Sequence, residues 1–259
     1  MKINSQKNPR NNYITMQSAL IFILFSTGTA FSQLKYGLKA GLNLADVEQA
    51  VTISGQFTSE NVTTNSGGSG GTTSTSTVEN ISQTVTVSTT PLISFYAGGY
   101  IEKVINKKQN LAVRVELLYA RNGTNVDRRE ENLNAENILS YTSSGGKYIV
   151  HQLNLPILLK YTTNKKLAFT AGCYFGAIIA AEAIGSNGQT FDLKARLKNY
   201  DFGLSVGASY PINNKLSAEF TYNRGIANLD PFKTIIAPFQ VSSEFYTRAL
   251  HFGLAYKLN

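Results

Sequence analysis

Several residue types that carry chemistry are scarce in this 259-residue chain, which has one cysteine (Cys173), two histidines and no tryptophan. A single cysteine excludes an intramolecular disulfide, so the chain is not one of the disulfide-stapled small domains common among secreted proteins. Metal sites need clustered His, Cys or carboxylate side chains, and the acidic run Glu130-Glu131 lies beside Arg128-Arg129, as in a solvated loop. No glycine-rich phosphate loop follows a strand and opens a helix. We therefore expect no metal site and no cofactor.

Long apolar runs and dense charge are missing too. Past residue 33 no eighteen apolar residues run together, which excludes a transmembrane helix. Charged residues make up 15% of the chain, with 24 basic and 16 acidic side chains. Lys2, Lys7 and Arg10 lie in the first ten residues, so the remainder carries 21 − 16 = +5. These charges are scattered and form no stripe, so we expect no nucleic-acid partner.

The N-terminus has the three parts of a secretory signal peptide. A basic start precedes the apolar run Ala19–Phe25 and the small-residue stretch Ala30-Phe31-Ser32. The run is too short to cross about 30 Å of hydrocarbon, which argues against a membrane anchor. We predict a signal peptide over residues 1–32, cleavage between Ser32 and Gln33, and one domain over residues 33–259. A start at Met16 stays open, although it would remove the basic residues.

Alternation with period two dominates the remaining chain, as in half-buried β-strands. For example, Leu111, Val113 and Val115 share one face of a segment, and Arg114 and Glu116 share the other. We predict eight strands, at about Lys35–Asp46, Leu92–Val104, Asn110–Arg121, Tyr148–Thr162, Lys166–Ala180, Asn199–Pro211, Lys215–Arg224 and Thr247–Leu258.

The connections between these strands alternate strictly between short and long. The short ones are 105–109, 163–165 and 212–214, and the long ones are 47–91, 122–147, 181–198 and 225–246. Membrane barrels place short turns in the periplasm and long loops outside, so an even strand number puts both chain ends in the periplasm. Residues 48–91 form a low-complexity Ser/Thr/Gly-rich outer loop. We expect it to be mobile, because it has little apolar surface to bury, with Val85 and Val87 placed to extend a hairpin above the membrane.

Alternation alone does not show which face points inward, since a soluble barrel of the lipocalin type has the same period with apolar side chains inside. Aromatic residues favour the membrane version, because they fall near strand ends on the apolar face, as in the two girdles at membrane interfaces. The predicted girdles are Tyr36, Tyr161, Tyr210 and Tyr256 at the periplasmic ends, and Phe95, Tyr119, Phe175 and Tyr222 at the outer ends.

Charges in mid-strand occupy the opposite face. They are Lys39, Arg114, Glu116, Glu219 and His251. Facing lipid, each basic side chain would cost about 2–4 kcal/mol at mid-depth, whereas inside a barrel opposite charges can pair. We therefore predict an all-β, eight-stranded, antiparallel up-and-down transmembrane barrel of the bacterial outer membrane, with these five residues as a luminal charge network. Side chains fill an eight-stranded lumen, so it should not conduct.

Four segments resemble the PorT-like outer-membrane barrel family of Bacteroidota, and in order they span the whole mature chain. They are Tyr36-Gly37-Leu38-Lys39-Ala40-Gly41-Leu42-Asn43, Val115-Glu116-Leu117-Leu118-Tyr119, Leu155-Pro156-Ile157-Leu158-Leu159-Lys160-Tyr161 and Asp201-Phe202-Gly203-Leu204. The resemblance implies an integral outer-membrane barrel, and some members of that family serve type IX secretion. The Ser/Thr/Gly-rich loop is larger than the family leads us to expect, so no member's specific role is carried over.

The end of the chain, with Gly253, Tyr256 and Leu258 spaced after His251, resembles the C-terminal signal read by the outer-membrane insertion machinery. We expect that machinery and outer-membrane lipid as partners, together with a protein of the envelope or of secretion. The leading interpretation is a non-enzymatic scaffold acting through its outer loops. Two alternatives stay open: a lipid hydrolase using His251 with Glu219 and Ser217, and a secreted soluble barrel that binds a small apolar ligand.

Overall fold

The computed structural model describes residues 34–64, 72–106, 108, 110–132, 140–230, 233–236 and 239–259. These residues form β1 (Leu34–Thr64), β2 (Thr72–Thr86), β3 (Thr89–Val104), β4 (Leu111–Asn132), β5 (Ser140–Thr162), β6 (Ala168–Gly185), β7 (Thr190–Asp192), β8 (Tyr200–Pro211), β9 (Leu216–Gly225), β10 (Lys233–Ile236) and β11 (Phe239–Lys257). Among them no helix is long and apolar enough to cross a membrane. The predicted signal peptide and its cleavage site at Ser32 and Gln33 lie outside the described residues.

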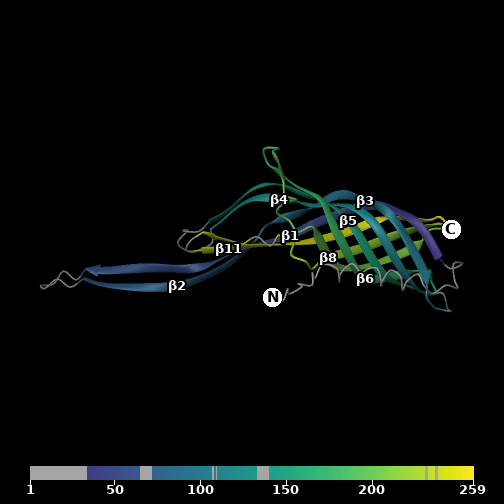
Figure 1. Ribbon diagram of the computed structural model, residues 1–259, viewed down its shortest axis with the longest axis horizontal. Coiled ribbons are helices and arrows are strands. Elements are labelled where there is room, and N and C mark those ends of the chain that lie inside the picture. Colours follow the sequence, from purple (N-terminus) through teal and green to yellow (C-terminus); the bar gives the residue numbers. More distant parts are fainter. Residues whose placement is uncertain are drawn as a thin grey trace, which may run out of the picture. The chain divides into compact units, whose positions relative to one another are not determined.

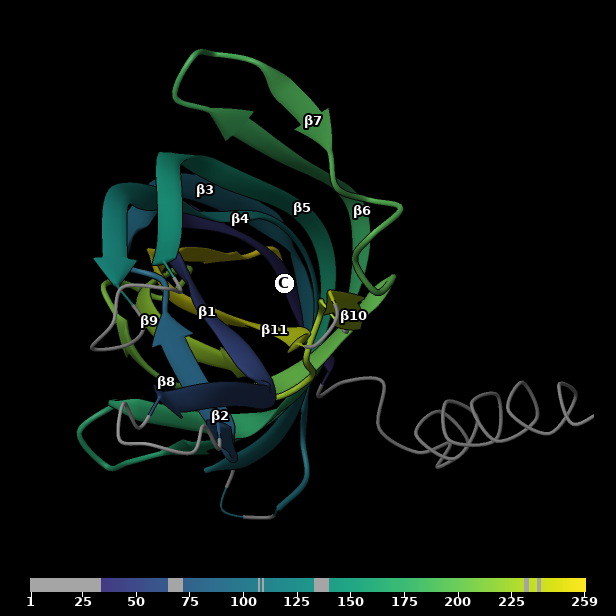
Figure 2. The same cartoon turned by 90° about the vertical axis from the view of Figure 1, so that its left-hand side faces the viewer.

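Eight of the strands close into a ring in the order β1-β3-β4-β5-β6-β8-β9-β11, and β11 pairs back onto β1 (Figure 2). The closing pair stays in antiparallel register from Gly37 opposite Lys257 to Gly55 opposite Phe239. Because ring neighbours follow one another along the chain, the fold is an up-and-down barrel, and closure leaves the ring without a free edge. The predicted all-β, eight-stranded architecture is confirmed.

Three short turns lie at the end of the barrel where β1 begins and β11 ends, which we call the short-turn end. In two of them an asparagine side chain replaces backbone partners: Asn213 Oδ1 accepts the amides of Lys215 and Leu216, both at 2.8 Å, and Asn106 Oδ1 accepts the Leu111 amide at 3.0 Å. Such Asx contacts favour tight reversals. The alternation of short and long connections predicted from the sequence follows from these turns.

The opposite, long-loop end differs from the prediction, because strands continue where loops were expected. β1 runs on to Thr64, eighteen residues past the predicted end at Asp46, and pairs with β2 from Ala50 opposite Thr86 to Thr64 opposite Thr72. Figure 1 shows β1 and β2 continuing together past the ring. The composition of residues 48–91 argued for a loop with little to bury. Paired strands, however, satisfy their backbone groups without burial, and Thr and Val suit an extended backbone.

Side-chain orientation follows the prediction on both faces of the ring. Leu117, Val206 and Leu254 point outward and are 53%, 50% and 48% exposed. Arg114 and Glu219 point inward and are 4% and 8% exposed. A soluble barrel would show the reverse arrangement, so the apolar face of this barrel is its outside.

Glycine makes room for two tyrosine rings inside the barrel. A Cβ added to Gly203 would lie 2.5 Å from Cε1 of Tyr174, and one added to Gly37 would lie 2.7 Å from the Tyr100 ring. Both distances are shorter than any ordinary contact, so these rings pack directly against the glycine backbone. These two in-strand glycines therefore serve close packing in the lumen.

Candidate functional site

Six charged side chains meet inside the barrel, in the half nearer the short turns. We call them the luminal ion-pair network: Lys39, Glu102, Arg114, Glu116, Lys160 and Glu219. Lys39 Nζ lies 3.0 Å from Glu116 Oε2 and 2.9 Å from Glu219 Oε2. On the other side of Glu219, Arg114 Nη1 reaches its Oε1 at 2.6 Å. The two carboxylate oxygens of Glu219 thus join the two cations.

Glu102 and Lys160 extend this network. Arg114 Nη2 lies 2.8 Å from Glu102 Oε2, and Lys160 Nζ lies 2.9 Å from the same oxygen. The network then holds three cations and three carboxylates and is neutral. Neutrality matters because an uncompensated buried charge destabilises a fold strongly. The charge network predicted from the sequence does not include these two residues. Each is next to an outward-facing residue (Ile101 or Leu159), so the alternation places both in the lumen.

His251 lies beside this network, and no ion pair of the described residues includes it. Its ring stacks on Tyr96, with centroids 4.3 Å apart and planes 14° apart, and Lys39 lies 5.8 Å from the centre of the same Tyr96 ring. The reason is register: His251 is opposite Thr221, whereas Glu219 is opposite Gly253, two residues nearer the short turns. His251, predicted as a member of the charge network, therefore packs beside the network and forms no ion pair with it among the described residues.

The hydrolase alternative required a base, a carboxylate and a hydroxyl within reach of one another. His251 Nδ1 lies 3.4 Å from Asn223 Nδ2, and its Nε2 has no hydrogen-bond partner among the described residues. Both oxygens of Glu219 are engaged by Lys39 and Arg114. Ser217 is opposite Ala255, four residues along the strand from the His251 rung, a separation of about 13 Å. The geometry does not assemble this triad.

A second layer of hydrogen bonds crosses the lumen above His251. Asn43 Nδ2 donates to Asn122 Oδ1 at 2.9 Å, Asn122 Nδ2 to Gln152 Oε1 at 2.6 Å, and Gln152 Nε2 to Asp201 Oδ2 at 3.1 Å. Tyr174 and Thr247 also donate their hydroxyls to Asp201, at 3.0 and 2.8 Å. This polar layer links β1, β4, β5, β6, β8 and β11, so the lumen is bridged from wall to wall.

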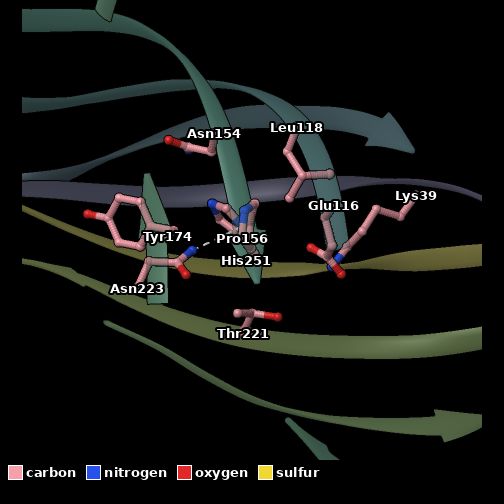
Figure 3. Close-up of a pocket in the computed structure, with 9 residues that line it drawn as sticks. All are labelled: Lys39, Glu116, Leu118, Asn154, Pro156, Tyr174, Thr221, Asn223 and His251. Atoms are coloured by element: carbon pink, nitrogen blue, oxygen red, sulfur yellow. Dashed lines mark hydrogen bonds and ion pairs between the residues drawn. The ribbon is translucent and has the colours of Figure 1, made fainter. Parts of the chain in front are cut away.

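Between the network and the polar layer lies a small cavity, shown with its lining in Figure 3. Its lining includes Lys39, Glu116, Asn154, Tyr174 and His251. Its volume of about 10 Å³ is about the space of one water molecule. A passage for ions or solutes would need far more room, so the described residues fill this part of the lumen.

Apolar side chains close the long-loop end of the interior. We call them the apolar cap: Val47, Val150, Ile178, Ala181, Leu197, Leu229 and Phe245. Leu197 and Leu229 come from connections, and the Lys198 amide donates to the Leu229 carbonyl at 2.9 Å, which ties the two connections together. The Leu229 amide donates to the Phe245 carbonyl of β11, also at 2.9 Å. Sequence reasoning missed the cap, because nothing local shows that these loops fold inward.

Asp46 and Tyr148 lie beyond the apolar outer band, and their pKa values are shifted. Burial raises the pKa of the Asp46 carboxyl, but hydrogen bonds from Thr124, Thr89, the Val47 amide and Arg248 outweigh burial and hold this pKa below its ordinary value. Burial also raises the pKa of the Tyr148 hydroxyl, with Arg196 opposing it and Asp230 reinforcing it.

The predicted girdle residues all lie on the outward face. Tyr36, Phe95, Tyr161, Phe175, Tyr210 and Tyr256 are exposed, and Tyr119 and Tyr222 are half-buried. The first outward charges beyond Leu44 form ion pairs: Asp46 with Arg248 at 2.5 Å and Glu48 with Arg224 at 2.6 Å. On β1 the outer face is apolar from Tyr36 to Leu44, 44 − 36 + 1 = 9 residues, which fits a tilted strand crossing hydrocarbon at about 9–11 residues.

Within the described ranges, no group of three or more His, Cys, Asp or Glu side chains is arranged to hold a metal ion. Cys173 is half-buried on β6 and has a free thiol. The expectation of no metal and no cofactor therefore stays a prediction.

An apolar outer band, a polar interior that holds a neutral ion-pair network, and a closed ring of eight strands define an integral membrane β-barrel. Residues 4–230 match the model of the family described as "Outer membrane protein beta-barrel domain", and the chain belongs to this family. Its location is the bacterial outer membrane. The alternative of a secreted soluble barrel is wrong, because its apolar side chains would have to face inward.

Several solved structures are similar to the chain at low identity. Ail, the attachment invasion locus protein of Yersinia pestis, is 10% identical, with 86% of this chain and 98% of that chain covered and a TM-score of 0.35. OprG from Pseudomonas aeruginosa is 12% identical, with 87% and 96% covered and a TM-score of 0.39. Neisserial surface protein A is 12% identical, with 82% and 97% covered and a TM-score of 0.37. No curated protein matches the chain.

Proposed function

We propose that this protein is a non-enzymatic outer-membrane scaffold whose long-loop end contacts another protein of the envelope or of secretion. The packing of the interior carries the proposal: between the described residues of the ion-pair network, the polar layer and the apolar cap lie small cavities of about 10 Å³ each. A barrel whose described interior is filled, and whose described residues do not bring His251, Glu219 and Ser217 together, is expected to act through its surfaces. Short turns lie in the periplasm in membrane barrels, so the proposal places the long-loop end outside the cell.

The hairpin of β1 and β2 is the proposed contact. Beyond Gly55 it continues as a two-stranded ribbon to Thr64 and Thr72. Its outer strand, β2, has fifteen residues with one charged residue, Glu79, and no proline. Exposed edge strands are usually protected by charge or proline, and an unprotected edge suits the addition of a strand from a partner. The proposed partner therefore presents an extended segment to β2.

In-cell crosslinking tests this proposal. A photoreactive amino acid in place of Val78, which is 55% exposed, should form a defined adduct with one envelope protein. The variant that joins Gln56 to Asn80, which face each other across the hairpin, removes Val78, so the photoreactive amino acid is placed at Thr84 instead. At Thr84 it should form the adduct in the full-length hairpin and not in this shortened variant. The matched control joins Arg128 to Ser144, which face each other across β4 and β5, and should keep it. Adducts that persist in the shortened hairpin would refute the assignment.

The role of β11 in assembly is a further part of the proposal. β11 closes the ring against β1 and exposes Phe252, Leu254 and Tyr256 outward, which supports its reading as the signal for the insertion machinery. The variant Tyr256→Ala should slow membrane insertion without lowering the stability of the refolded barrel greatly. The narrower PorT-like membership, and with it a link to secretion, is likewise proposed on the four quoted segments.

The non-enzymatic part has its own test. Because His251 contacts Tyr96 and Asn223 and no carboxylate among the described residues, the variant His251→Ala should leave the lipid composition of the membrane unchanged. A change in lipid A or phospholipid acylation that depends on His251 would establish the hydrolase instead.

A further inference from the structure

Lysine is the charged side chain that the short-turn end presents to its surroundings. Each of the three short turns carries at least one exposed lysine: Lys108 between β3 and β4, Lys165 and Lys166 between β5 and β6, and Lys215 between β8 and β9. These residues are far apart in the sequence, and only the closed ring brings their turns to one end of the molecule. The charges look scattered along the chain for this reason.

Two strand termini complete the circle. Lys35 is the second residue of β1 and Lys257 is the last residue of β11, and both are half-buried. The Lys257 amide donates to the Lys215 carbonyl at 2.7 Å, so neighbouring members lie close together. We call these six residues the lysine rim: Lys35, Lys108, Lys165, Lys166, Lys215 and Lys257.

Nearby negative charge does not balance the lysine rim. In the described residues of this end (34–37, 102–106, 108, 110–113, 160–169, 209–217 and 254–259) the one acidic side chain is Glu102. It is 4% exposed and engaged by Arg114 and Lys160 inside the barrel. Among the described residues, the exposed charged side chains of this end are therefore cationic. The long-loop end is different, since its outward arginines pair with acids there, as Arg248 does with Asp46.

The lysine rim also lies at a defined depth. Tyr36, Tyr161, Tyr210 and Tyr256 point outward within two residues of the strand ends that carry the rim. Tyrosine rings in such positions sit at the level of lipid headgroups, and lysine extends its amine from there into the polar layer while its stem covers apolar surface. We propose that the lysine rim binds the phosphate groups of negatively charged phospholipids in the leaflet at the short-turn end.

The size of the effect follows from the charge. A lysine near an anionic surface contributes about 1 kcal/mol, which is about a fivefold preference for an anionic over a zwitterionic lipid at a contacting site. If sites at the long-loop end have no preference, the average over both leaflets is about threefold. Removing four of the six lysines leaves a third of the part of this preference that exceeds one. The preference averaged over both leaflets should then fall below about twofold.

Electron paramagnetic resonance with spin-labelled lipids measures this preference in vesicles that contain the full folded protein. Phosphatidylglycerol and phosphatidylcholine probes are compared in phosphatidylcholine bilayers. The test variant changes Lys108, Lys165, Lys166 and Lys215 to Gln. The control variant makes the same charge change at the long-loop end, at Lys147, Lys194, Lys198 and Lys233. All substituted rim positions lie in turns, and far-UV circular dichroism checks that both variants fold. The double variant Lys165→Gln/Lys166→Gln serves if the fourfold variant does not fold.

The wild type and the control should show the threefold preference, and the rim variant should lose most of it. At about 1 M salt, where the Debye length is about 3 Å, the preference should disappear in all three proteins. Equal association of both lipids with the wild type would overturn the proposal and would point to a soluble acidic partner for the lysine rim. A preference that falls equally in the control variant would also overturn it, because net charge would then explain the result.

Discussion

Arg114 is the residue whose loss should damage the barrel interior most. Its guanidinium lies within 2.8 Å of Glu102 and 2.6 Å of Glu219, and within 3.6 Å of Glu116. It also lies 4.4 Å from the centre of the Tyr100 ring. The variant Arg114→Met would keep most of the stem but leave two cations against three carboxylates in a closed space.

The expected loss of unfolding free energy is about 3–5 kcal/mol, the range for removing one partner of a buried ion pair. This corresponds to about two to four orders of magnitude in the unfolding equilibrium constant. The exposed pair of Arg224 and Glu48, whose side chains are 35% and 41% exposed, is the matched control. Arg224→Met should cost about 0–1 kcal/mol, because solvent already screens that charge.

A second substitution separates charge balance from packing. In Arg114→Met/Glu219→Gln the network returns to two cations and two carboxylates. The double variant should therefore be less destabilised than the sum of its two single variants, with a coupling of about 0.5–3 kcal/mol. Urea unfolding in lipid vesicles, followed by far-UV circular dichroism, gives all four free energies. A cost below about 1 kcal/mol for Arg114→Met, or strict additivity in the double variant, would refute the argument from a neutral buried network.

Three further outcomes follow from the structure. The folded pKa of Asp46 lies below its ordinary value of 3.8. Its carboxylate therefore stabilises the fold above pH 3.8, and this contribution is lost as the pH falls through the folded pKa. In pH-dependent urea unfolding, the stability advantage of the wild type over Asp46→Asn should be full at pH 7 and shrink below about pH 4. Leu229→Ala in the apolar cap should lower the free energy of unfolding by about 2–5 kcal/mol, measured by the same method. The control Ile235→Ala, at a side chain 78% exposed, should change it little. Equal losses in both variants would mean that the cap is not packed. In planar bilayers the wild type should give no steady conductance, and stable single-channel steps would show that the lumen is open.

The barrel itself was predictable from the sequence because strand alternation is a local signal. In the Leu111–Tyr119 segment, the position of each residue in the alternating pattern predicts on which face of the strand it lies. The same alternation applies to the seven other predicted strands. The charges on the inner face could be assigned in the same way. Glu102 and Lys160 were within reach of this rule, since each alternates with an outward apolar neighbour.

The long-loop end was not predictable for two physical reasons. The sequence of β2 is mostly Ser and Thr, so only Val85 and Val87 indicated the hairpin that β1 and β2 form, and its length depends on backbone pairing that side-chain composition does not show. Likewise, Leu197 and Leu229 reach the interior only because two separate connections meet over the mouth of the ring. His251 shows a related limit. Its place in the alternation predicted that it faces the lumen, but the register that sets which residues lie opposite it could not be predicted from the sequence.

The outward orientation of the apolar face in a lipid bilayer is tested most directly by accessibility along one strand. In a Cys173→Ala background, single nitroxide labels are placed through β8, and their relaxation by oxygen and by a water-soluble nickel complex is measured in vesicles. Labels at Leu204 and Val206, which are 54% and 50% exposed, should be open to oxygen and closed to nickel. A label at Ser205, 1% exposed, should be closed to both. Nickel access at Leu204 and Val206, with oxygen access highest at Ser205, would contradict the account.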